Sequence, residues 1–421
     1  MSRVLLLSNG HGEDLSGSLL ARLLLERGVT VAALPLVGHG RAYRQAGVPV
    51  LGSTREFSTG GLGYTSLAGR LTELIQGQVL YMLGKAWQLW RHRRRFDLVV
   101  AVGDVVPLVG AWLTGLPAAV YLVAYSSHYE GRLRLPWPAG PLLRRRRCLR
   151  VWSRDALTAS DLSEQLRRPV TFLGNPFLDP VAIEPKAHQA APAQAQEAEG
   201  VPSLGLLPGS RLPEAAANLE LMLDVLARLP APLQGPGALR LRAALVGDLS
   251  AERVGQLAAS HHWQLETRAE RAGGTATVLR RGELVLELVW DGFAGILAGS
   301  DLLLSMAGTA AEQAVGLGRP VLQLAGRGPQ FTEGFAEAQR RLLGPGVICA
   351  EGEPGSEAVL TATAALVADL LAELGDPERG PLWRRQLARN GQERIGRPGG
   401  SARMAAAIME LLPPVEPATH G

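Results

Sequence analysis

The sequence predicts an α/β protein of two Rossmann-like, doubly wound domains that face each other across a cleft. An apolar run, a glycine turn and a helical pattern follow one another in "RVLLLSNGHGEDLSGSLLARLLLERG" (3–28). The same order restarts in "SLGLLPGSRLPEAAANLELMLDVLARLP" (203–230), and each restart marks a new doubly wound domain. Between them, residues 184–202 are rich in Ala, Gln, Glu and Pro, a composition typical of a linker.

These observations set the expected boundaries. A chain of 421 residues has the length for two or three domains. We expect one domain over residues 1–183 and a second over 201–385. The tail is expected to hold two helical segments broken at residues 397–400.

Composition excludes several classes of protein. Hydrophobic residues make up 47% and charged residues 19%, with 50 glycines, which fits an α/β protein with many tight turns. Cys148 and Cys349 form no motif, so a disulfide framework or zinc cluster is not expected and a reducing cytosol is favoured. The net charge of +4 comes almost wholly from arginine, since Lys85 and Lys186 are the only lysines. The "GKA" at Gly84 lacks the Ser or Thr of a phosphate-binding P-loop, which argues against that class.

Two apolar segments of the sequence bear on whether the chain has a signal peptide or a membrane span. The apolar run before Ser8 is too short for a signal peptide and indicates a first strand. Residues 105–124, "VVPLVGAWLTGLPAAVYLVA", contain no charge and are long enough to span a bilayer. Prolines and glycines divide this segment into a strand end, a short helix, a turn and a strand. A buried core is therefore the expectation, and a membrane span is the alternative.

The segment "SMAGTAAEQAVGLG" (305–318) predicts an anion site. Gly308 and Thr309 stand where a helix begins, and the first amides of a helix have no partner within it. Thr309 can cap the helix or donate its hydroxyl, and Glu312 lies one turn further, where its carboxylate could reach ribose hydroxyls. The alternative is an ordinary Thr-capped helix with a solvated glutamate.

A second turn with donors that could bind an anion is "LLPGSRLPE" (206–214), and we call this turn and the one at 305–309 the anion-ready turns. Gly209 and Ser210 offer backbone and hydroxyl donors, and the guanidinium of Arg211 can bind a phosphate with two donors. The alternative is a Ser-capped helix with Arg211 on the surface.

The N-terminal turn "SNGHGEDLSG" (8–17) is different in character. Gly10 and Gly12 flank His11, but the third glycine of a dinucleotide fingerprint falls on Leu15. An acidic turn suits a neutral, hydroxyl-bearing acceptor, with His11 or Glu13 as a base. The alternative is a polar helix start. The candidate residues of this turn are His11, Gly12, Glu13 and Asp14.

Asp104 is a further candidate base, because it follows the apolar strand "LVVAVG". Partial burial would raise its pKa toward a value useful for taking a proton from a sugar hydroxyl. The alternative is an Asp that caps the next helix. No metal-binding motif is found, and helix amides with Arg211 could stabilise a leaving pyrophosphate without a metal.

Two segments favour contact with an anionic lipid surface. Residues 62–95 place aromatic and apolar side chains ahead of the arginines at 91–95. In "PWPAGPLLRRRR" (136–147), a tryptophan and apolar residues likewise precede a run of arginines. Each basic residue near such a surface contributes on the order of 1 kcal/mol. The alternative is a core helix with a solvated basic end. Nucleic acid is not expected, because no recognised binding motif accompanies the arginines.

With these residues assembled, the chain resembles the lipid-A-disaccharide synthases and, more closely, the lipid-A-disaccharide synthase-related proteins of cyanobacteria. These belong with the GT-B glycosyltransferases. The resemblance is carried by "LLPGSR" (206–211), "FLGNPFLDP" (172–180) and "AGTAAEQAVGLGRPV" (307–321), with "RDALTASDL" (154–162) and "GPQFTEGFAEAQRRLLG" (328–344) also shared.

The resemblance implies a GT-B fold with a UDP-sugar donor bound by the second domain, no cofactor, and an inverting hexosyl transfer to a lipid or glycolipid acceptor bound by residues 1–183. It also implies tail helices over 386–415 that cross back to the first domain, and a cytoplasmic protein on the inner face of a membrane. The implied donor-binding residues are Gly209, Ser210, Arg211, Ala307, Gly308, Thr309, Glu312 and Gln330. Gly12, Asp14 and Asn175 are placed on the acceptor side.

The departures from the synthases lie on the acceptor side. Asp104 matches one acid of an Asp-x-Pro-Asp type motif, and the second acid is missing from "GDVVPLV". The turn "GHGEDLSG" also differs from the synthases' form. We therefore expect a metal-independent glycosyltransferase in which Asp104, His11 or Glu13 is the base. The rivals are a UDP-sugar 2-epimerase of the same fold, a non-catalytic UDP-sugar-binding regulator and, more weakly, a dinucleotide oxidoreductase.

Overall fold

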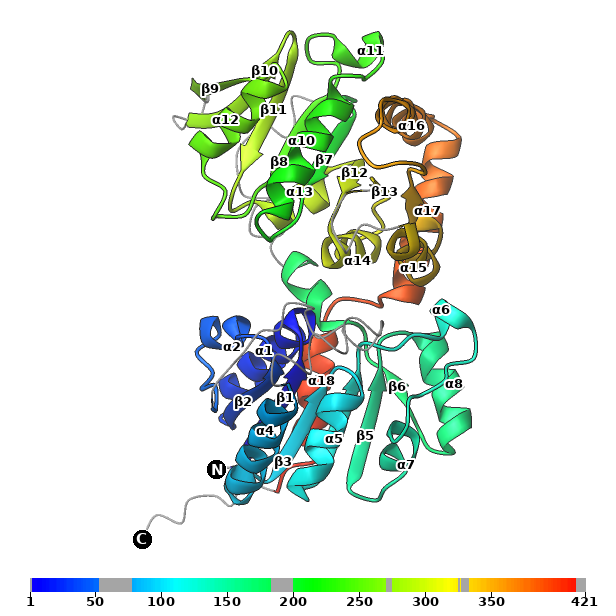
Figure 1. Ribbon diagram of the computed structural model, residues 1–421. Helices are drawn as coiled ribbons and strands as arrows, with labels where there is room; N and C mark the ends of the chain where they lie inside the picture. Colours follow the sequence, from blue (N-terminus) through cyan, green and yellow to red (C-terminus); the bar gives the residue numbers. More distant parts are fainter. Residues whose placement is uncertain are drawn as a thin grey trace. The chain divides into compact units, whose positions relative to one another are not determined.

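The computed structural model describes residues 2–52, 78–182, 200–269, 275–324, 326 and 333–413. The chain forms two compact units (Figure 1). Unit 1 comprises Met1–Asp179 and Gly396–Gly421, and unit 2 comprises Pro180–Ile395. The predicted linker lies outside the described residues except for 200–202.

Unit 1 is built on a parallel sheet of order β2-β1-β3-β4-β5-β6. Every residue of β3 and β4 is buried, as expected for strands covered on both faces. The chain runs from β1 outward to β2 and later returns to the other side of β1 as β3, so the strand order reverses between β1 and β3. The strands are β1 (Arg3–Asn9), β2 (Thr30–Val37), β3 (Leu98–Val102), β4 (Ala118–Leu122), β5 (Cys148–Ser153) and β6 (Thr171–Phe172).

Helices cover both faces of this sheet. The core of one face includes side chains from α1, α2 and α18, and the core of the other includes side chains from α4, α5, α7 and α8. The helices are α1 (His11–Glu26), α2 (Arg41–Gln45), α4 (Gln78–His92), α5 (Val105–Thr114), α6 (Ser127–Glu130), α7 (Ala139–Leu143), α8 (Ala156–Leu166) and α18 (Gly400–Met409), with 3-10 turns η2 (Arg93–Arg95) and η3 (Pro176–Leu178).

The uncharged segment 105–124 forms part of this core. It folds as α5, a turn at Gly115 and β4, and it does not form one continuous helix. The prolines and glycines of this segment therefore correctly predicted a short helix, a turn and a buried strand.

Unit 2 contains a sheet of order β14-β13-β12-β7-β8-β11-β10-β9. It is parallel from β14 to β11, whereas β9 and β10 run antiparallel to their neighbours, which makes the sheet mixed and not purely doubly wound. The strands are β7 (Ser203–Leu207), β8 (Arg240–Ala244), β9 (Gln264–Ala269), β10 (Thr275–Arg281), β11 (Leu284–Val289), β12 (Leu302–Ser305), β13 (Val321–Gln323) and β14 (Val347–Cys349).

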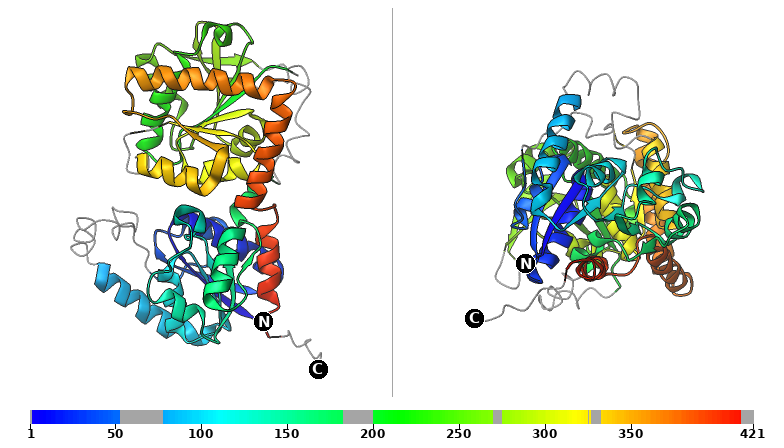
Figure 2. Two further views of the ribbon diagram at one scale, coloured as in Figure 1. Left: turned by 90° about the vertical axis from the view of Figure 1, so that its right-hand side faces the viewer. Right: turned by 90° about the horizontal axis from the view of Figure 1, so that it is seen from below.

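One face of the sheet of unit 2 is covered by α10, α12 and α16 (Figure 2). Among the described residues, α16 is the one helix with the length and apolar composition to cross a membrane, and its apolar side packs into the core of unit 2. The helices are α10 (Glu214–Leu226), α11 (Ala231–Gln234), α12 (Ala251–Ser260), α13 (Phe293–Gly299), α14 (Gly308–Gly316), α15 (Glu333–Leu343), α16 (Glu357–Gly375) and α17 (Arg379–Arg394), with the 3-10 turn η5 (Gly344–Gly346).

The chain leaves unit 1 at Asp179 and re-enters it at Gly396, and the two places are bound together. The carboxylate of Asp179 accepts hydrogen bonds from the backbone of Gly399 (2.6 Å) and Gly400 (3.2 Å), and from both the backbone (2.8 Å) and the hydroxyl of Ser401. These are the first amides of α18, which packs beside α1 (Figure 1). The Asp of "FLGNPFLDP" therefore anchors the last helix to unit 1.

The expected boundaries need two corrections. The first domain ends at Asp179, four residues before the expected 183, and unit 2 extends to Ile395. We expected the whole tail from 386 to cross back. Instead α17 packs against α14 and α16 in unit 2, and only the chain from Gly396 belongs to unit 1.

Candidate functional site

The two anion-ready turns of unit 2 lie side by side. β7 pairs with β12 in parallel, with Leu207 opposite Ser305, so the turns that follow them leave the same edge of the sheet. The amide of Met306 donates to the carbonyl of Leu207 (2.9 Å), and a Cβ on Gly209 would lie 3.8 Å from the carbonyl oxygen of Met306. The strand order reverses between β7 and β12, and open α/β sheets bind ligands outside the strand ends at such a reversal.

The start of α14 has no side-chain cap. Ala307 occupies the cap position with extended backbone (φ −140°), and Gly308 begins the helix. The hydroxyl of Thr309 does not cap the helix, because Thr309 is already its second residue. The alternative of a Thr-capped helix is therefore wrong, and within the described residues α14 has no side-chain cap at its N-cap position. Thr309 is exposed, and Glu312 is half-buried one turn further on.

The neighbouring turn, 208–213, presents polar side chains to solvent. Ser210 and Arg211 are exposed, and Ser210 does not cap a helix, because α10 begins only at Glu214. The amide of Asn218 donates to the carbonyl of Pro208 (2.8 Å) and fastens the turn to α10. Gln330, the remaining donor-side candidate, lies outside the described residues.

Unit 1 gathers acidic groups at its own strand-order reversal. β1 ends at Asn9 and β3 is followed by Gly103 and Asp104, so these residues leave neighbouring strands at the same edge. The amide of Asn9 donates to Asp104 Oδ2 (3.1 Å), and Asp104 Oδ1 accepts from the backbone of Val106 (2.7 Å). Asp104 thus caps α5, as one reading of the sequence expected, and its second oxygen is bound by Asn9.

The side chain of Glu13 lies between two glycines. A Cβ on Gly10 would stand 2.6 Å from Glu13 Oε2, and one on Gly103 would stand 3.2 Å from Glu13 Cγ. Both glycines have φ of +138°, which other residues rarely adopt. Gly10 and Gly103 therefore allow the Glu13 side chain to reach this edge of the sheet.

Burial shifts the acids of this cluster toward the neutral form. Burial is the main reason that the pKa of Glu13 rises from 4.5 to about 7, with the charges of Asp104 and Asp14 adding to it and Arg154 opposing it. Burial also raises the pKa of Asp104, while the hydrogen bonds from Val106 and Asn9 lower it. A carboxylate with a pKa near 7 is suited to general-base chemistry at neutral pH.

Three other predicted residues of unit 1, Asp14, Asn175 and Gly12, contribute no side chain to this cluster. Asp14 is 3% exposed and accepts from the hydroxyl of Ser8 (2.6 Å). Asn175 is fully buried, with its oxygen accepting from Tyr121 (3.0 Å). Gly12 lies in the first turn of α1. His11 begins α1, and its side chain lies outside what the structure describes.

Two residues of this cluster were not predicted from the sequence. Asn9 orients Asp104, and the signal for it is an amide at the end of the first strand. Arg154 follows β5, is 5% exposed and donates to the carbonyl of Val123 (3.1 Å). Its charge acts on Glu13, and only the fold brings positions 13 and 154 within range. Among the described residues no group of three or more His, Cys, Asp and Glu could hold a metal ion.

Comparison with known proteins identifies the fold. No family model matches the sequence, and no curated protein matches it significantly. Among solved structures, MurG of Acinetobacter baumannii has a TM-score of 0.57 at 12% identity, covering 97% of this chain and 100% of its own. The glycosyltransferase of kitacinnamycin has 0.59 at 16% identity (98% and 99%), and the UDP-GlcNAc 2-epimerase of Neisseria meningitidis, bound to UDP-GlcNAc, has 0.51 at 14% (97% and 100%).

These likenesses extend over both units. The chain therefore has the GT-B fold, with one α/β unit built on a parallel sheet and one on a mixed sheet. At identities this low the comparison establishes the fold, and the chemistry has to be argued from the residues.

Proposed function

We propose that this protein is a glycosyltransferase that moves a sugar from a UDP-sugar to a lipid-linked or glycolipid acceptor. One observation carries the proposal. The turns 208–211 and 306–309 meet at the strand-order reversal of unit 2, beside a helix whose first amides have no side-chain cap. Free amides at a helix start attract an anion such as a pyrophosphate, and the exposed Arg211 adds a positive charge.

In the proposed reaction unit 2 holds the donor and unit 1 supplies the base. The amides of Gly308 and Thr309, with Ser210 and Arg211, bind the pyrophosphate, and Glu312 binds the ribose. Glu13 takes the proton from an acceptor hydroxyl, whose oxygen forms a bond to the anomeric carbon as the bond to UDP breaks. The configuration at that carbon inverts, and the negative charge that develops on UDP is stabilised without a metal.

Between Asp104 and Glu13, whose side chains the structure describes, we take Glu13 as the base, and His11 stays a candidate whose side chain lies outside the described residues. Both oxygens of Asp104 are engaged, by Val106 and Asn9, and its charge raises the pKa of Glu13. Asp104 then acts as a positioning residue that keeps Glu13 a better proton acceptor at neutral pH.

A surface of unit 1 supports a membrane-bound acceptor. Residues 78–95, 105–117 and 131–147 contain no acidic residue, and we call their exposed part the aromatic and basic surface. Helices α4, α5 and α7 from these segments share one face of the sheet (Figure 1). Four tryptophans on this surface are exposed: Trp87 (56%), Trp90 (57%), Trp112 (46%) and Trp137 (86%).

The orientation of α4 strengthens this proposal. Leu83, Trp87 and Trp90 have the spacing of one helix face, and that face is exposed. The guanidinium of Arg91 lies 5.2 Å from the ring of Trp87. Tryptophan beside arginine is typical of groups that lie at a lipid headgroup boundary.

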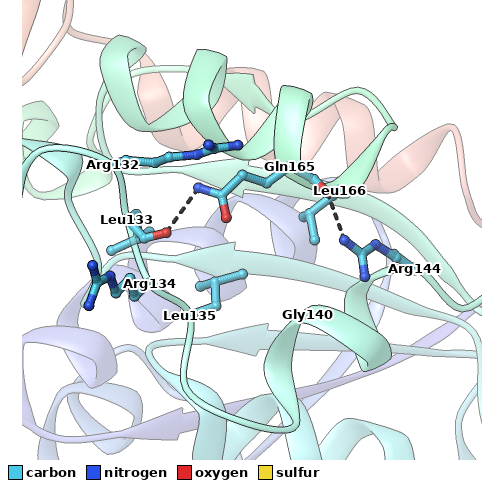
Figure 3. A pocket seen from close by; sticks show the side chains of 8 residues that line it. All are labelled: Arg132, Leu133, Arg134, Leu135, Gly140, Arg144, Gln165 and Leu166. Carbon is cyan, nitrogen blue, oxygen red and sulfur yellow. Dashed lines mark hydrogen bonds between the residues drawn. The ribbon is translucent and has the colours of Figure 1, made fainter.

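A pocket of about 680 Å³ lies within the 131–147 segment and the end of α8. Figure 3 shows Leu133, Leu135 and Leu166 in its middle, with Arg132, Arg134 and Arg144 around them. Arg144 donates to the carbonyl of Gln165 (2.7 Å), which fixes one side of the pocket. Apolar side chains inside a basic rim match the chemistry of an anionic lipid.

Calorimetric titration with UDP in the absence of divalent metal tests the donor site. Wild-type protein is expected to bind UDP, and Glu312→Ala is expected to weaken binding about tenfold or more, because a hydrogen bond to a charged group is lost. Glu252→Ala, on an exposed site of α12, should leave UDP binding unchanged. A folded wild type that does not bind UDP would rule out the donor site.

Wild type, Glu312→Ala and a Glu13→Gln variant distinguish the rival functions. A 2-epimerase of the same fold would interconvert UDP-sugars with no lipid acceptor present. A regulator would bind UDP-sugar, lose binding with Glu312→Ala and release no UDP. A transferase releases UDP only when an acceptor is supplied, and Glu13→Gln abolishes that release.

A further inference from the structure

The last strand of the sheet of unit 1 leaves part of its neighbour uncovered. β6 pairs with β5 only at Trp152 and Ser153, so within the described residues Cys148–Val151 have no partner strand on the side of β6. A pocket of about 1160 Å³ lies at this place. Its walls come from the turn between α7 and β5, from the turn between α8 and β6, and from α18 through Ala407.

The walls of this pocket are strongly basic. Six arginines line it, and within the described ranges no acidic residue does so. None of the six forms an ion pair with the described part of the chain. Like charges gathered around one hollow repel one another, and a bound anion relieves that repulsion. The six are Arg144, Arg145, Arg146, Arg150, Arg167 and Arg168.

Two of these guanidinium groups are held in place by backbone carbonyls. Arg168 donates to the carbonyl of Leu143 at the end of α7 (2.5 Å) and to that of Leu149 in β5 (3.3 Å). Arg144 donates to the carbonyl of Gln165 in α8 (Figure 3). A carbonyl fixes a guanidinium without neutralising its charge, so the pocket is preorganised for an anion, and arginine binds phosphate with two donors.

Arg167 stands at a position that favours glycine. It follows α8 with a φ of +53°, the left-handed conformation in which glycine is the usual residue at the end of a helix. Its side chain is exposed and lines the pocket. The chain therefore places a positive charge here despite the backbone strain.

We propose that this pocket is a second anion site, which binds a phosphate group carrying about two or more negative charges. A phosphomonoester or a pyrophosphate carries such a charge. This chemistry is common to soluble polyphosphates and to the headgroup of phosphatidic acid. Leu149 and Leu173 in the wall give an attached chain an apolar contact. The site lies wholly in unit 1, so the inference does not depend on the donor site proposed for unit 2.

Hydrogen exchange in the presence of inorganic pyrophosphate locates the site. In wild type, peptides that cover residues 144–151 and 167–173 are expected to exchange at least about threefold more slowly when pyrophosphate is bound. Protection of residues 206–211 and 306–309 reports the proposed donor site separately, so the failure of one site is recognised without the other. No protection at 144–151 and 167–173 overturns the inference.

A double variant tests the charges. Arg145→Gln with Arg146→Gln should raise the pyrophosphate concentration for half-maximal protection about tenfold or more, because two charged donors are lost. Within the described part of the chain neither side chain makes a hydrogen bond, so the fold loses no contact. Arg22→Gln with Arg27→Gln removes two exposed charges at the end of α1 and should leave that concentration unchanged. Equal concentrations in all three proteins overturn the inference.

Arg167→Gly separates binding from folding. Glycine adopts the left-handed conformation without strain, so this variant should melt at an equal or higher temperature than wild type while binding pyrophosphate several-fold more weakly. Pyrophosphate binding that this substitution leaves unchanged contradicts the proposed site.

Vesicles distinguish the two sources of the phosphate group. If the ligand is a lipid, wild type should bind vesicles with phosphatidic acid more tightly than phosphatidylglycerol vesicles of equal surface charge, pyrophosphate should release it, and the Arg145→Gln, Arg146→Gln variant should lose the preference. If the ligand is soluble, both kinds of vesicle bind wild type alike and the protection by pyrophosphate remains.

Discussion

At the scale of single residues, Glu13 and Asp14 show how neighbouring acids take different roles. Glu13 points to the edge of the sheet that carries Asp104, and Asp14 points into a buried chain of hydrogen bonds that runs through Ser8 to Tyr43. The sequence placed both in one acidic turn and left the base open among three residues. Only side-chain direction separates them, because successive residues of a helix lie about 100° apart around its axis.

The pH dependence of stability should report the half-buried carboxyl of Glu13. Its folded pKa of about 7 lies above its ordinary value of 4.5, so its contribution to stability is fully present below pH 4.5 and is lost as pH rises through 7. The loss at pH 8 is at most about 3.5 kcal/mol. Glu13→Gln cannot ionise, so it should be more stable than wild type at pH 8 and about equal to it at pH 4.5.

Thermal melts of both proteins at pH 4.5 and pH 8 measure this difference. Asp14 is present in both, so its own titration largely cancels. Equal pH dependence in the two proteins would show that Glu13 is not buried as described. In a transfer assay the same variant should lose about a hundredfold or more in kcat, as expected when a general base is removed.

At the scale of helices and strands, the ends of helices carry most of the specific interactions. In unit 2, α12 and α16 are capped by Ser250 and Ser356, whereas α14 begins behind Ala307 with no side-chain cap. In unit 1, α8 is capped by Asp155. The start of α18 is hydrogen-bonded by the carboxylate of Asp179, which precedes Gly399 by 220 residues in the sequence. The sequence predicted that helices start after these turns, and it could not show which starts are closed by a side chain.

Asp179→Ala should loosen α18. The substitution removes an acceptor for three backbone amides and one hydroxyl at a buried helix start, which we expect to cost about 2 kcal/mol or more. Hydrogen exchange over residues 400–409 and the melting temperature measure the effect. Asp376→Ala removes a partly exposed Asp that accepts from two amides at the start of α17, and it should cost less. Unchanged exchange in α18 would contradict the anchoring role of Asp179.

At the scale of the whole molecule, charge is distributed unevenly along the chain. The three acid-free segments of unit 1 carry ten arginines, yet the net charge of all 421 residues is only +4. Exposed tryptophans occur within the same segments. Such a surface is expected to bind anionic lipid and to bind it less tightly as salt increases.

Vesicle binding tests the aromatic and basic surface. Wild type should sediment with vesicles that contain phosphatidylglycerol and not with phosphatidylcholine alone. Trp87→Ser with Trp90→Ser should weaken binding about tenfold, because two interfacial anchors are lost. Leu382→Ser changes a residue of unit 2 that is 53% exposed and should have no effect. Equal binding by all variants would rule out this surface as the lipid contact.

The sequence alone determined the two α/β units, most strands around the two reversals and the turns at 208–211 and 306–309, because apolar runs, glycines and helical periodicity are local signals. The tertiary structure decided what these signals could not encode. It set the exact unit boundaries, the antiparallel strands β9 and β10, the open start of α14, and the meeting of Asn9, Glu13, Asp104 and Arg154. Residues far apart in sequence become neighbours only when parallel strands pair, and burial then sets which carboxyl holds its proton.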